Sequence, residues 1–131
     1  MQFSSVLWVA LGGSLGATSR YLLGLWLNNV FPHYPAGTLA VNLLGSGCAG
    51  VLLGLSLYLS PPPPAFMLIV MTGFLGSFTT FSAFGYETHA LLLQGSAPRA
   101  LTHIAANVLG SLSMVTGGLF LVKLLRALWL K

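Results

Sequence analysis

Four long apolar runs, separated by short breaks, divide this chain. They cover residues 3–26, 37–59, 65–93 and 99–125, and each is long enough for a helix that crosses the bilayer core of about 30 Å. The breaks read "LNNVFPHYP", "SPPPP" and "QGSAP", in which proline, glycine and asparagine disfavour a continuous helix. The pattern predicts an all-α integral membrane protein with four transmembrane helices in a single transmembrane domain, residues 1–131.

Composition strengthens this prediction. The 131 residues are 56% hydrophobic and 5% charged, with a mean hydropathy of +0.89, whereas soluble domains carry about 25% charged residues. Five basic residues and one acid could not cover the surface of a water-soluble fold. A net charge of +4 is too sparse for nucleic-acid binding, so we expect the lipid bilayer and no nucleic acid as a partner. The first run lacks a basic flank, and no cleavable signal peptide is expected.

Candidate chemistry for an enzyme is missing from the sequence. It contains no phosphate-binding loop and no nucleophile with a plausible base. His33, His89 and His103 share no metal-ligand spacing, and each suits an interfacial or packed position better. The lone Cys48 leaves the redox compartment open. We therefore expect that the protein is not an enzyme.

The positive charges leave the topology open. With four spans, both chain ends and the proline loop share one side, which carries Lys123, Arg126 and Lys131, while Arg20 and Arg99 lie on the other. Topology normally follows a clear excess of Lys and Arg on one side. A bias this weak permits insertion in both directions, for which a two-fold antiparallel dimer is the simplest closed assembly. A single orientation is the alternative.

The third run contains the unusual stretch "GFLGSFTTFSAFGYE", residues 73–87. As one helix, residues 65–93 would be about 43 Å long, which exceeds the bilayer core, so the helix either tilts strongly or is interrupted. Its glycines and the Thr79–Thr80 pair make its middle the easiest place to interrupt. Broken backbone at this depth must be buried or line a wet cavity. Its carbonyl groups would suit a hard cation such as sodium, and its half-helix N-terminus an anion.

Phenylalanine recurs through this stretch at helical spacing. Phe74, Phe78, Phe81 and Phe84 follow one another at steps of four, three and three, and therefore lie near one helix face. Packing is the simpler interpretation. The alternative uses the positive edge of an aromatic ring, which could replace part of the hydration shell of a small anion.

Isolated polar residues in the other spans are further candidates. Asn42 and Ser111 could donate hydrogen bonds to an ion, and polar groups at this depth tend to face the bundle interior. Serine and threonine often bond back to their own helix instead. Asn42 has no such easy local partner and is the stronger candidate.

Four motifs, taken together, resemble the Fluc (CrcB) fluoride channels: "GGSLGATSRY", "GTLAVNLLG", "TGFLGSFTTFSAFGYET" and "NVLGSLSMVTG". They lie in all four predicted spans. The resemblance implies a four-helix subunit that forms an antiparallel, dual-topology homodimer with two fluoride pores. It also implies a structural sodium ion at the dimer centre, and a location in the bacterial plasma (inner) membrane.

The resemblance also implies roles for individual residues. Backbone carbonyls of Gly76 and Thr79, from the broken third helix, would hold the sodium. Arg20 and Glu87 match supporting charged positions near helix ends. The residues matching the fluoride pore are Asn42, Phe81, Phe84, Ser82, Ser111 and Thr116.

The sequence departs from the usual family motif in several places. Leu75, Ser77 and Phe78 stand where cysteine, glycine and leucine are frequent, and Ala83 and Gly85 replace hydroxyl residues. The row of hydroxyl groups along the predicted path is therefore thinner than usual. Phe78 lies outside the family's pore set, and we expect it to be a packing residue.

The resemblance favours passive, selective export of fluoride. A function from another class is a small four-helix, proton-coupled multidrug antiporter, which would need Glu87, the only carboxylate in the chain, to exchange a proton for a cation. Glu87 falls toward the end of its span rather than the centre. A membrane subunit that transports nothing is the third interpretation.

Overall fold

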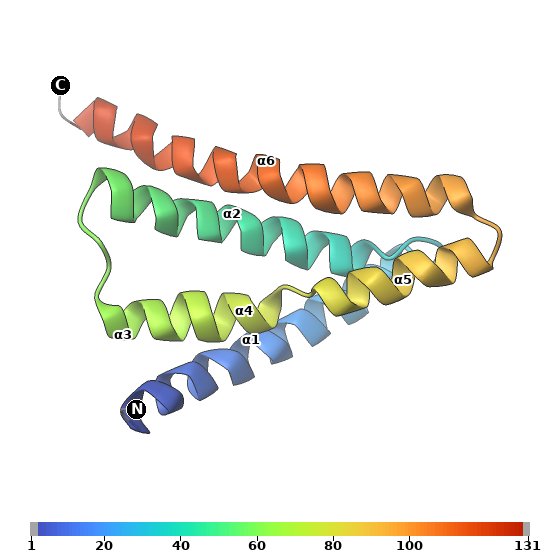
Figure 1. Ribbon diagram of the computed structural model, residues 1–131, viewed down its shortest axis with the longest axis horizontal. Helices are drawn as coiled ribbons and strands as arrows, with labels where there is room; N and C mark the ends of the chain where they lie inside the picture. Colours follow the sequence, from blue (N-terminus) through green and yellow to red (C-terminus); the bar gives the residue numbers. More distant parts are fainter. Residues whose placement is uncertain (1–2, 130–131) are drawn as a thin grey trace.

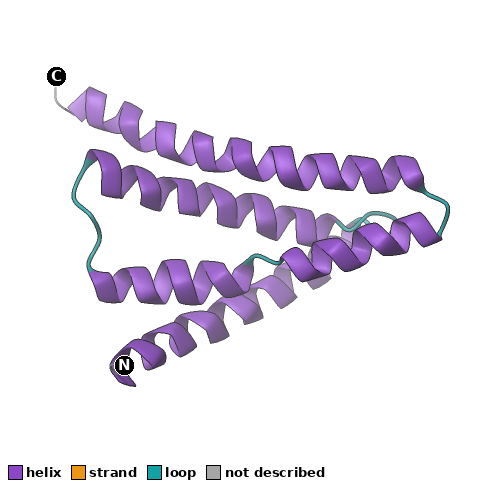
Figure 2. Ribbon diagram, in the orientation of Figure 1, coloured by secondary structure: helices purple, strands orange, loops and turns teal. Residues whose placement is uncertain are grey.

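The structure, a computed structural model, describes residues 3–129, and these contain helices, turns and loops without a strand (Figure 2). Seven helical segments follow one another: α1 (Phe3–Val30), α2 (Ala36–Tyr58), α3 (Pro64–Met67), η1 (Leu68–Leu75), α4 (Gly76–Phe78), α5 (Phe81–Leu93) and α6 (Ala97–Trp129). The segment η1 is a π-helix. This form is rare in proteins, and where it does occur it is often found at functional sites.

Among the described residues, three helical runs are long and apolar enough to cross a membrane: Ala36–Tyr58, Pro64–Leu93 and Ala97–Trp129. Large apolar side chains cover much of the surface; Leu109 and Leu112, for example, are both 63% exposed. So much exposed apolar surface suits lipid rather than water. The chain is therefore an all-α, multi-pass membrane protein. The 28-residue α1 is not among the three runs, and its crossing stays a prediction.

The helices run back and forth between two ends of the bundle (Figure 1). The two ends of the described chain and the α2–α3 connection lie at one end, and the α5–α6 connection lies at the other. α2 packs mainly along α6, while α1 packs along η1 and α4. The segments α3, η1, α4 and α5 follow one another in a single line, with a short non-helical stretch before α5.

Glycines allow these helices to approach closely. A Cβ atom at Gly50 of α2 would overlap the backbone of Val115 in α6, and one at Gly12 of α1 would overlap the carbonyl group of Ile69. Small residues at helix contacts are the usual means of close packing in lipid. The glycines therefore allow α1 and α2 to pack tightly against their neighbours.

The start of the first loop differs from the sequence prediction. The stretch "LNNVFPHYP" was expected to be loop from its first residue, but α1 continues through Asn28 to Val30. The prediction was wrong because Pro32, rather than the asparagines, sets the end: the residue before a proline is disfavoured in the helical conformation. Asn28 has a role of its own, since its Oδ1 accepts a hydrogen bond from the Gly37 backbone N–H at 3.0 Å.

Candidate functional site

The backbone leaves the helical conformation at Thr79 and Thr80. Thr79 has φ −81° and ψ 158°, and Thr80 has φ −152° and ψ 119°, so both are extended. The Thr79 N–H still donates to the Leu75 carbonyl oxygen at 3.0 Å, which completes the last turn before the interruption. The helical path resumes at Phe81, the first residue of α5.

Thr80 is the N-cap of α5. Its Oγ1 accepts a hydrogen bond from the Ala83 backbone N–H at 3.2 Å and lies 3.2 Å from the Ser82 hydroxyl. A threonine hydroxyl at this position satisfies one of the N–H groups that a helix start leaves without a partner. The second threonine of the pair therefore fixes the residue at which α5 begins.

Asn42 of α2 holds both backbone polar groups of Thr80. Its Oδ1 accepts from the Thr80 N–H at 2.8 Å, and its Nδ2 donates to the Thr80 carbonyl oxygen at 3.1 Å. The same Nδ2 donates to Oδ1 of Asn107 at 2.9 Å. An amide has two N–H donors, so both donors of Asn42 are engaged. The prediction that Asn42 donates to fluoride stays a prediction, and it requires one of these bonds to open.

The hydrogen bonds of the Thr80 and Ala83 N–H groups take helical partners away from the carbonyl groups of Gly76 and Thr79. In a continuous α-helix the N–H of Thr80 would donate to the Gly76 carbonyl, and that of Ala83 to the Thr79 carbonyl. Here the Thr80 N–H donates to Asn42 and the Ala83 N–H donates to the Thr80 hydroxyl. The interruption therefore leaves the carbonyl oxygens of Gly76 and Thr79 without their helical partners.

A buried polar chain continues from Asn42 into α6. Asn107 is 5% exposed and donates through Nδ2 to the His103 carbonyl oxygen at 3.0 Å. His103 is fully buried, with its ring packed against Tyr34 and Phe84. This agrees with the packed position expected for a histidine of this sequence. Its Nε2 lies 3.6 Å from Oε2 of Glu87 on α5.

A cavity of about 360 Å³ opens beside the interruption. Four predicted pore residues line it together: Asn42, Phe81, Phe84 and Ser111. The rings of Phe81 and Phe84 are 5.3 Å apart at their centroids and tilted by 54°. Phe84 is buried, whereas Phe81 is 82% exposed, so one wall of the cavity is open to the outside of the chain. The remaining lining comes from Ser46, Thr79, Thr80, Asn107, Val108 and Leu112.

Hydroxyl groups near the cavity differ in what they bond. Within the described part of the chain, the side chain of Ser111 makes no hydrogen bond, so its hydroxyl is available to a ligand. Ser82 and Thr116 are exposed and do not line this cavity. Ser82 lies next to the Thr80 hydroxyl, and Thr116 donates to its own helix at the Leu112 carbonyl, at 2.9 Å. The roles of Ser82 and Thr116 in the fluoride path therefore stay predictions.

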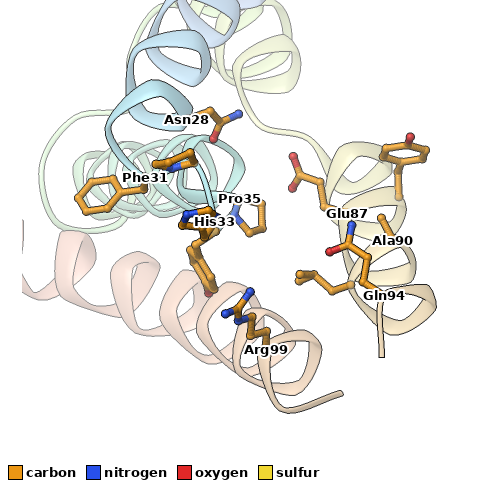
Figure 3. A pocket seen from close by; sticks show the side chains of 12 residues that line it. Asn28, Phe31, His33, Pro35, Glu87, Ala90, Gln94 and Arg99 are labelled. Atoms are coloured by element: carbon orange, nitrogen blue, oxygen red, sulfur yellow. The ribbon is translucent and has the colours of Figure 1, made fainter. Parts of the chain in front are cut away.

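The two predicted supporting charges lie in separate hollows. Arg20 borders a hollow of about 320 Å³ that reaches Thr38 and Thr80. Glu87 borders another, of about 340 Å³, and points across it toward the α1–α2 loop, with Arg99 on the α6 side (Figure 3). Oε1 of Glu87 accepts a hydrogen bond from the Thr38 hydroxyl at 2.7 Å. Both charged groups therefore stand outside the cavity that holds the phenylalanine rings.

Phe78, predicted to be a packing residue, is buried and stacks on Phe74, with ring centroids 5.5 Å apart. The sequence pattern indicated Thr80 only as part of the place where the third run could be interrupted, and it did not place Asn107 in the site. A polar residue inside an otherwise apolar run was the available signal for Asn107. Thr80 could have been predicted as a helix N-cap, because a threonine hydroxyl commonly accepts a hydrogen bond from the backbone N–H three residues later, here that of Ala83.

Fold and site together define a small, all-helical, multi-pass membrane protein. One of its helices is interrupted beside a cavity that is lined by aromatic rings and hydroxyl groups. Residues 7–119 match the family described as "CrcB-like protein, Camphor Resistance (CrcB)". The chain therefore belongs to the CrcB-like family.

Relatives from several bacteria carry one name, "Fluoride-specific ion channel FluC". The protein of Tolumonas auensis is 47% identical over 124 residues, which cover 93% of this chain and 96% of the relative. That of Chromohalobacter salexigens is 45% identical over 115 residues, 88% of this chain and 87% of the relative. That of Escherichia coli O1:K1 / APEC is 42% identical over 123 residues, 91% and 94%. These names describe channels rather than enzymes and give no support to the antiporter interpretation.

Proposed function

We propose that this chain is a fluoride-selective channel that lets fluoride leave the bacterial cytoplasm passively. The observation that carries the proposal is the cavity beside Thr79 and Thr80, where Phe81, Phe84 and Ser111 meet the start of α5. The names of the relatives support fluoride as the ion.

A small anion can be stabilised here without a fixed positive charge. The edge of an aromatic ring is positive, and the N-terminus of α5 carries the positive end of the helix dipole. The Ser111 hydroxyl lines the same cavity as the two rings and can donate a hydrogen bond. These groups would replace part of the hydration shell that fluoride must lose to enter a narrow path. Ser82 and Thr116 would continue the path where a second subunit closes it.

We also propose that the protein crosses the membrane four times and forms an antiparallel homodimer. α1 runs alongside the interrupted helix and would provide the fourth crossing. The open side of the cavity supports a dimer, because Phe81 and Tyr86 are 82% and 78% exposed on the same half-helix. A second subunit would cover these rings and give the path its remaining wall.

A sodium ion would be bound by backbone carbonyl groups of the interruption. Hard cations prefer oxygen ligands, and unwound helix carbonyls can provide them. The Gly76 and Thr79 carbonyl oxygens have lost their helical partners here. These two residues would hold the ion at the dimer centre, where its charge would offset carbonyl dipoles that lipid cannot satisfy.

Passive flow requires no coupling to another reaction. Hydrogen fluoride enters cells as a neutral acid and dissociates in the more alkaline cytoplasm, which traps fluoride inside. A membrane potential that is negative inside favours exit of the anion, by about 2.3 kcal/mol per 100 mV. Selectivity for fluoride would follow from the size and hydrogen-bonding strength of the ion at the cavity.

The proposal is tested by measuring fluoride efflux from liposomes that hold the purified protein, with a fluoride electrode. We expect rapid efflux when valinomycin and a potassium gradient permit charge balance. Efflux of chloride, measured in the same way, should be at least about a hundredfold slower, which corresponds to about 2.7 kcal/mol of discrimination. Equal rates for the two anions, or rates no higher than in protein-free liposomes, would contradict the proposal.

A further inference from the structure

The last turns of α6 contain two basic residues without an acidic partner. Lys123 and Arg126 are exposed, and a spacing of three residues places them on one face of the helix. The only carboxylate of the sequence, Glu87, lies on α5, which leads to the opposite end of the bundle (Figure 1). Among the described residues, neither basic side chain forms a salt bridge. Their counter-charge must therefore come from outside this chain.

Aromatic rings hold the amine of Lys123 at the end of α2. Its Nζ lies 6.0 Å from the ring centroid of Tyr58, the last residue of α2, and 5.6 Å from that of Phe120. The face of an aromatic ring attracts a cation at such distances. The charge of Lys123 is thus kept where the C-terminal ends of α2 and α6 lie side by side (Figure 1).

Arg126 stands at the rim of an apolar hollow. The hollow has a volume of about 450 Å³, and its other lining residues are Leu59, Leu125 and Trp129. All three are exposed, Trp129 by 92%, and tryptophan is enriched where lipid headgroups meet the acyl chains. A cation beside an exposed apolar hollow matches the two halves of a phospholipid, a charged headgroup and an acyl chain.

The length of α6 places Arg126 at the level of the lipid phosphates. At 1.5 Å per residue, its 33 residues span about 50 Å, which exceeds the hydrocarbon core of about 30 Å. Arg99 and Arg126 are about 40 Å apart along the helix, close to the thickness of a bilayer that includes both headgroup layers. The two arginines therefore lie in opposite headgroup layers, and the hollow extends from Arg126 toward the acyl chains.

We infer that the C-terminal ends of α2 and α6 form a binding site for an anionic phospholipid, whose phosphate group contacts Lys123 and Arg126 and whose acyl chain lies in the hollow against Trp129. A second copy of the chain is a poorer occupant, because it brings one carboxylate with five basic residues and a net charge of +4. The inference does not depend on which ion the protein conducts.

Quenching of Trp129 by brominated lipids tests whether a lipid occupies the hollow. The chain has three tryptophans, so Trp8→Phe combined with Trp26→Phe keeps only the one at the site. In phosphatidylcholine vesicles, brominated phosphatidylglycerol should quench Trp129 at a concentration about twenty-fivefold lower than brominated phosphatidylcholine, about fivefold for each basic residue. The matched control keeps only Trp8, on α1 at the same end of the bundle, and should be quenched equally by both lipids.

Charge variants in the Trp129-only protein test the headgroup contact. Lys123→Gln combined with Arg126→Gln removes both charges, and the two lipids should then quench Trp129 equally. Arg99→Gln, at the other end of α6, should leave the preference for phosphatidylglycerol unchanged. Arg126→Lys, which keeps the charge, should retain most of the preference and serves if the double variant fails to fold; a loss as large as that in Arg126→Gln would contradict the inference.

Three results would overturn the inference. The first is equal quenching of Trp129 by the two lipids, or a preference that survives in the double glutamine variant. The second is loss of the preference when inorganic phosphate replaces chloride at equal ionic strength, because the site would then bind a free anion. The third is a Trp129 that neither lipid quenches in the assembled protein, which would mean that a second copy covers the hollow. Should the protein pass no fluoride, the proposed function fails, and the quenching still decides the lipid site.

Discussion

Replacing Phe81 or Phe84 with isoleucine should lower fluoride efflux from liposomes by about two- to tenfold. Isoleucine keeps an apolar side chain in the cavity but has no ring edge to place near the anion. Each edge contact is worth about 0.5–1.5 kcal/mol, and about 1.4 kcal/mol corresponds to a tenfold rate. Water that refills the space would not restore the lost contact, because its dipoles are not fixed in position. The fluoride electrode measures the loss directly.

Phe120→Ile is the matched control for these variants. Phe120 is 55% exposed on α6 and does not line the cavity, so its replacement should leave efflux at the native rate. Size-exclusion chromatography should show the same oligomer for all three variants. Native efflux from both Phe81→Ile and Phe84→Ile would remove these rings from the path.

Withdrawal of sodium should have the second large effect. When N-methyl-D-glucamine replaces sodium at equal ionic strength, we expect fluoride efflux to fall at least about tenfold and the dimer to dissociate more readily. The physical reason is that carbonyl groups without partners at membrane depth cost several kcal/mol each. Crosslinking and the thermal midpoint report the dimer, and the electrode reports the efflux.

Returning sodium should restore both readouts, whereas the larger potassium ion should restore them poorly. Exchanging the accompanying anion at constant sodium is the control and should have no effect. A protein that conducts equally well and stays equally associated in sodium-free buffer would contradict the assignment of Gly76 and Thr79.

The arrangement of charge supports a path without formal charges at its centre. Arg20 and Glu87 lie in hollows apart from the cavity that holds Phe81 and Phe84. Oε1 of Glu87 accepts a hydrogen bond from the Thr38 hydroxyl at 2.7 Å, and Oε2 lies 3.6 Å from Nε2 of His103. A fixed positive charge beside the rings would bind many anions tightly and release them slowly. Ring edges and peptide dipoles attract an anion more weakly and suit rapid passage.

Hydrophobic patterning was enough to predict the class of fold. The long apolar runs and the breaks "SPPPP" and "QGSAP" can be recognised from local sequence alone, and the bounds of α2 and α6 lie within a few residues of the runs 37–59 and 99–125. The same reasoning ended the first helix too early at "LNNV". Asparagine disfavours helix only weakly, while Pro32 acts on the residue before it.

The details of the site depend on contacts that lie far apart in the sequence. Glycines and hydroxyl residues indicated where the third run could be interrupted, but the bonds that shape the backbone there come from Asn42, 38 residues before Thr80. Asn107, 65 residues from Asn42, completes the chain of amides. Periodicity carries no information on such pairs. It likewise could not separate Ser111, which lines the cavity, from Thr116, which bonds back to its own helix.

The central claim is that ring edges, rather than formal charges, contact the permeating anion. Fluorine-19 solid-state NMR tests it most directly, with fluoride bound to deuterated protein in lipid that carries protons only on its phenylalanine rings. Magnetisation should pass from ring protons to fluoride, and the transfer should be weaker in the Phe81→Ile and Phe84→Ile variants but unchanged in Phe120→Ile. A bound fluoride signal that receives no magnetisation from any ring, or the same amount in all three variants, would contradict the claim.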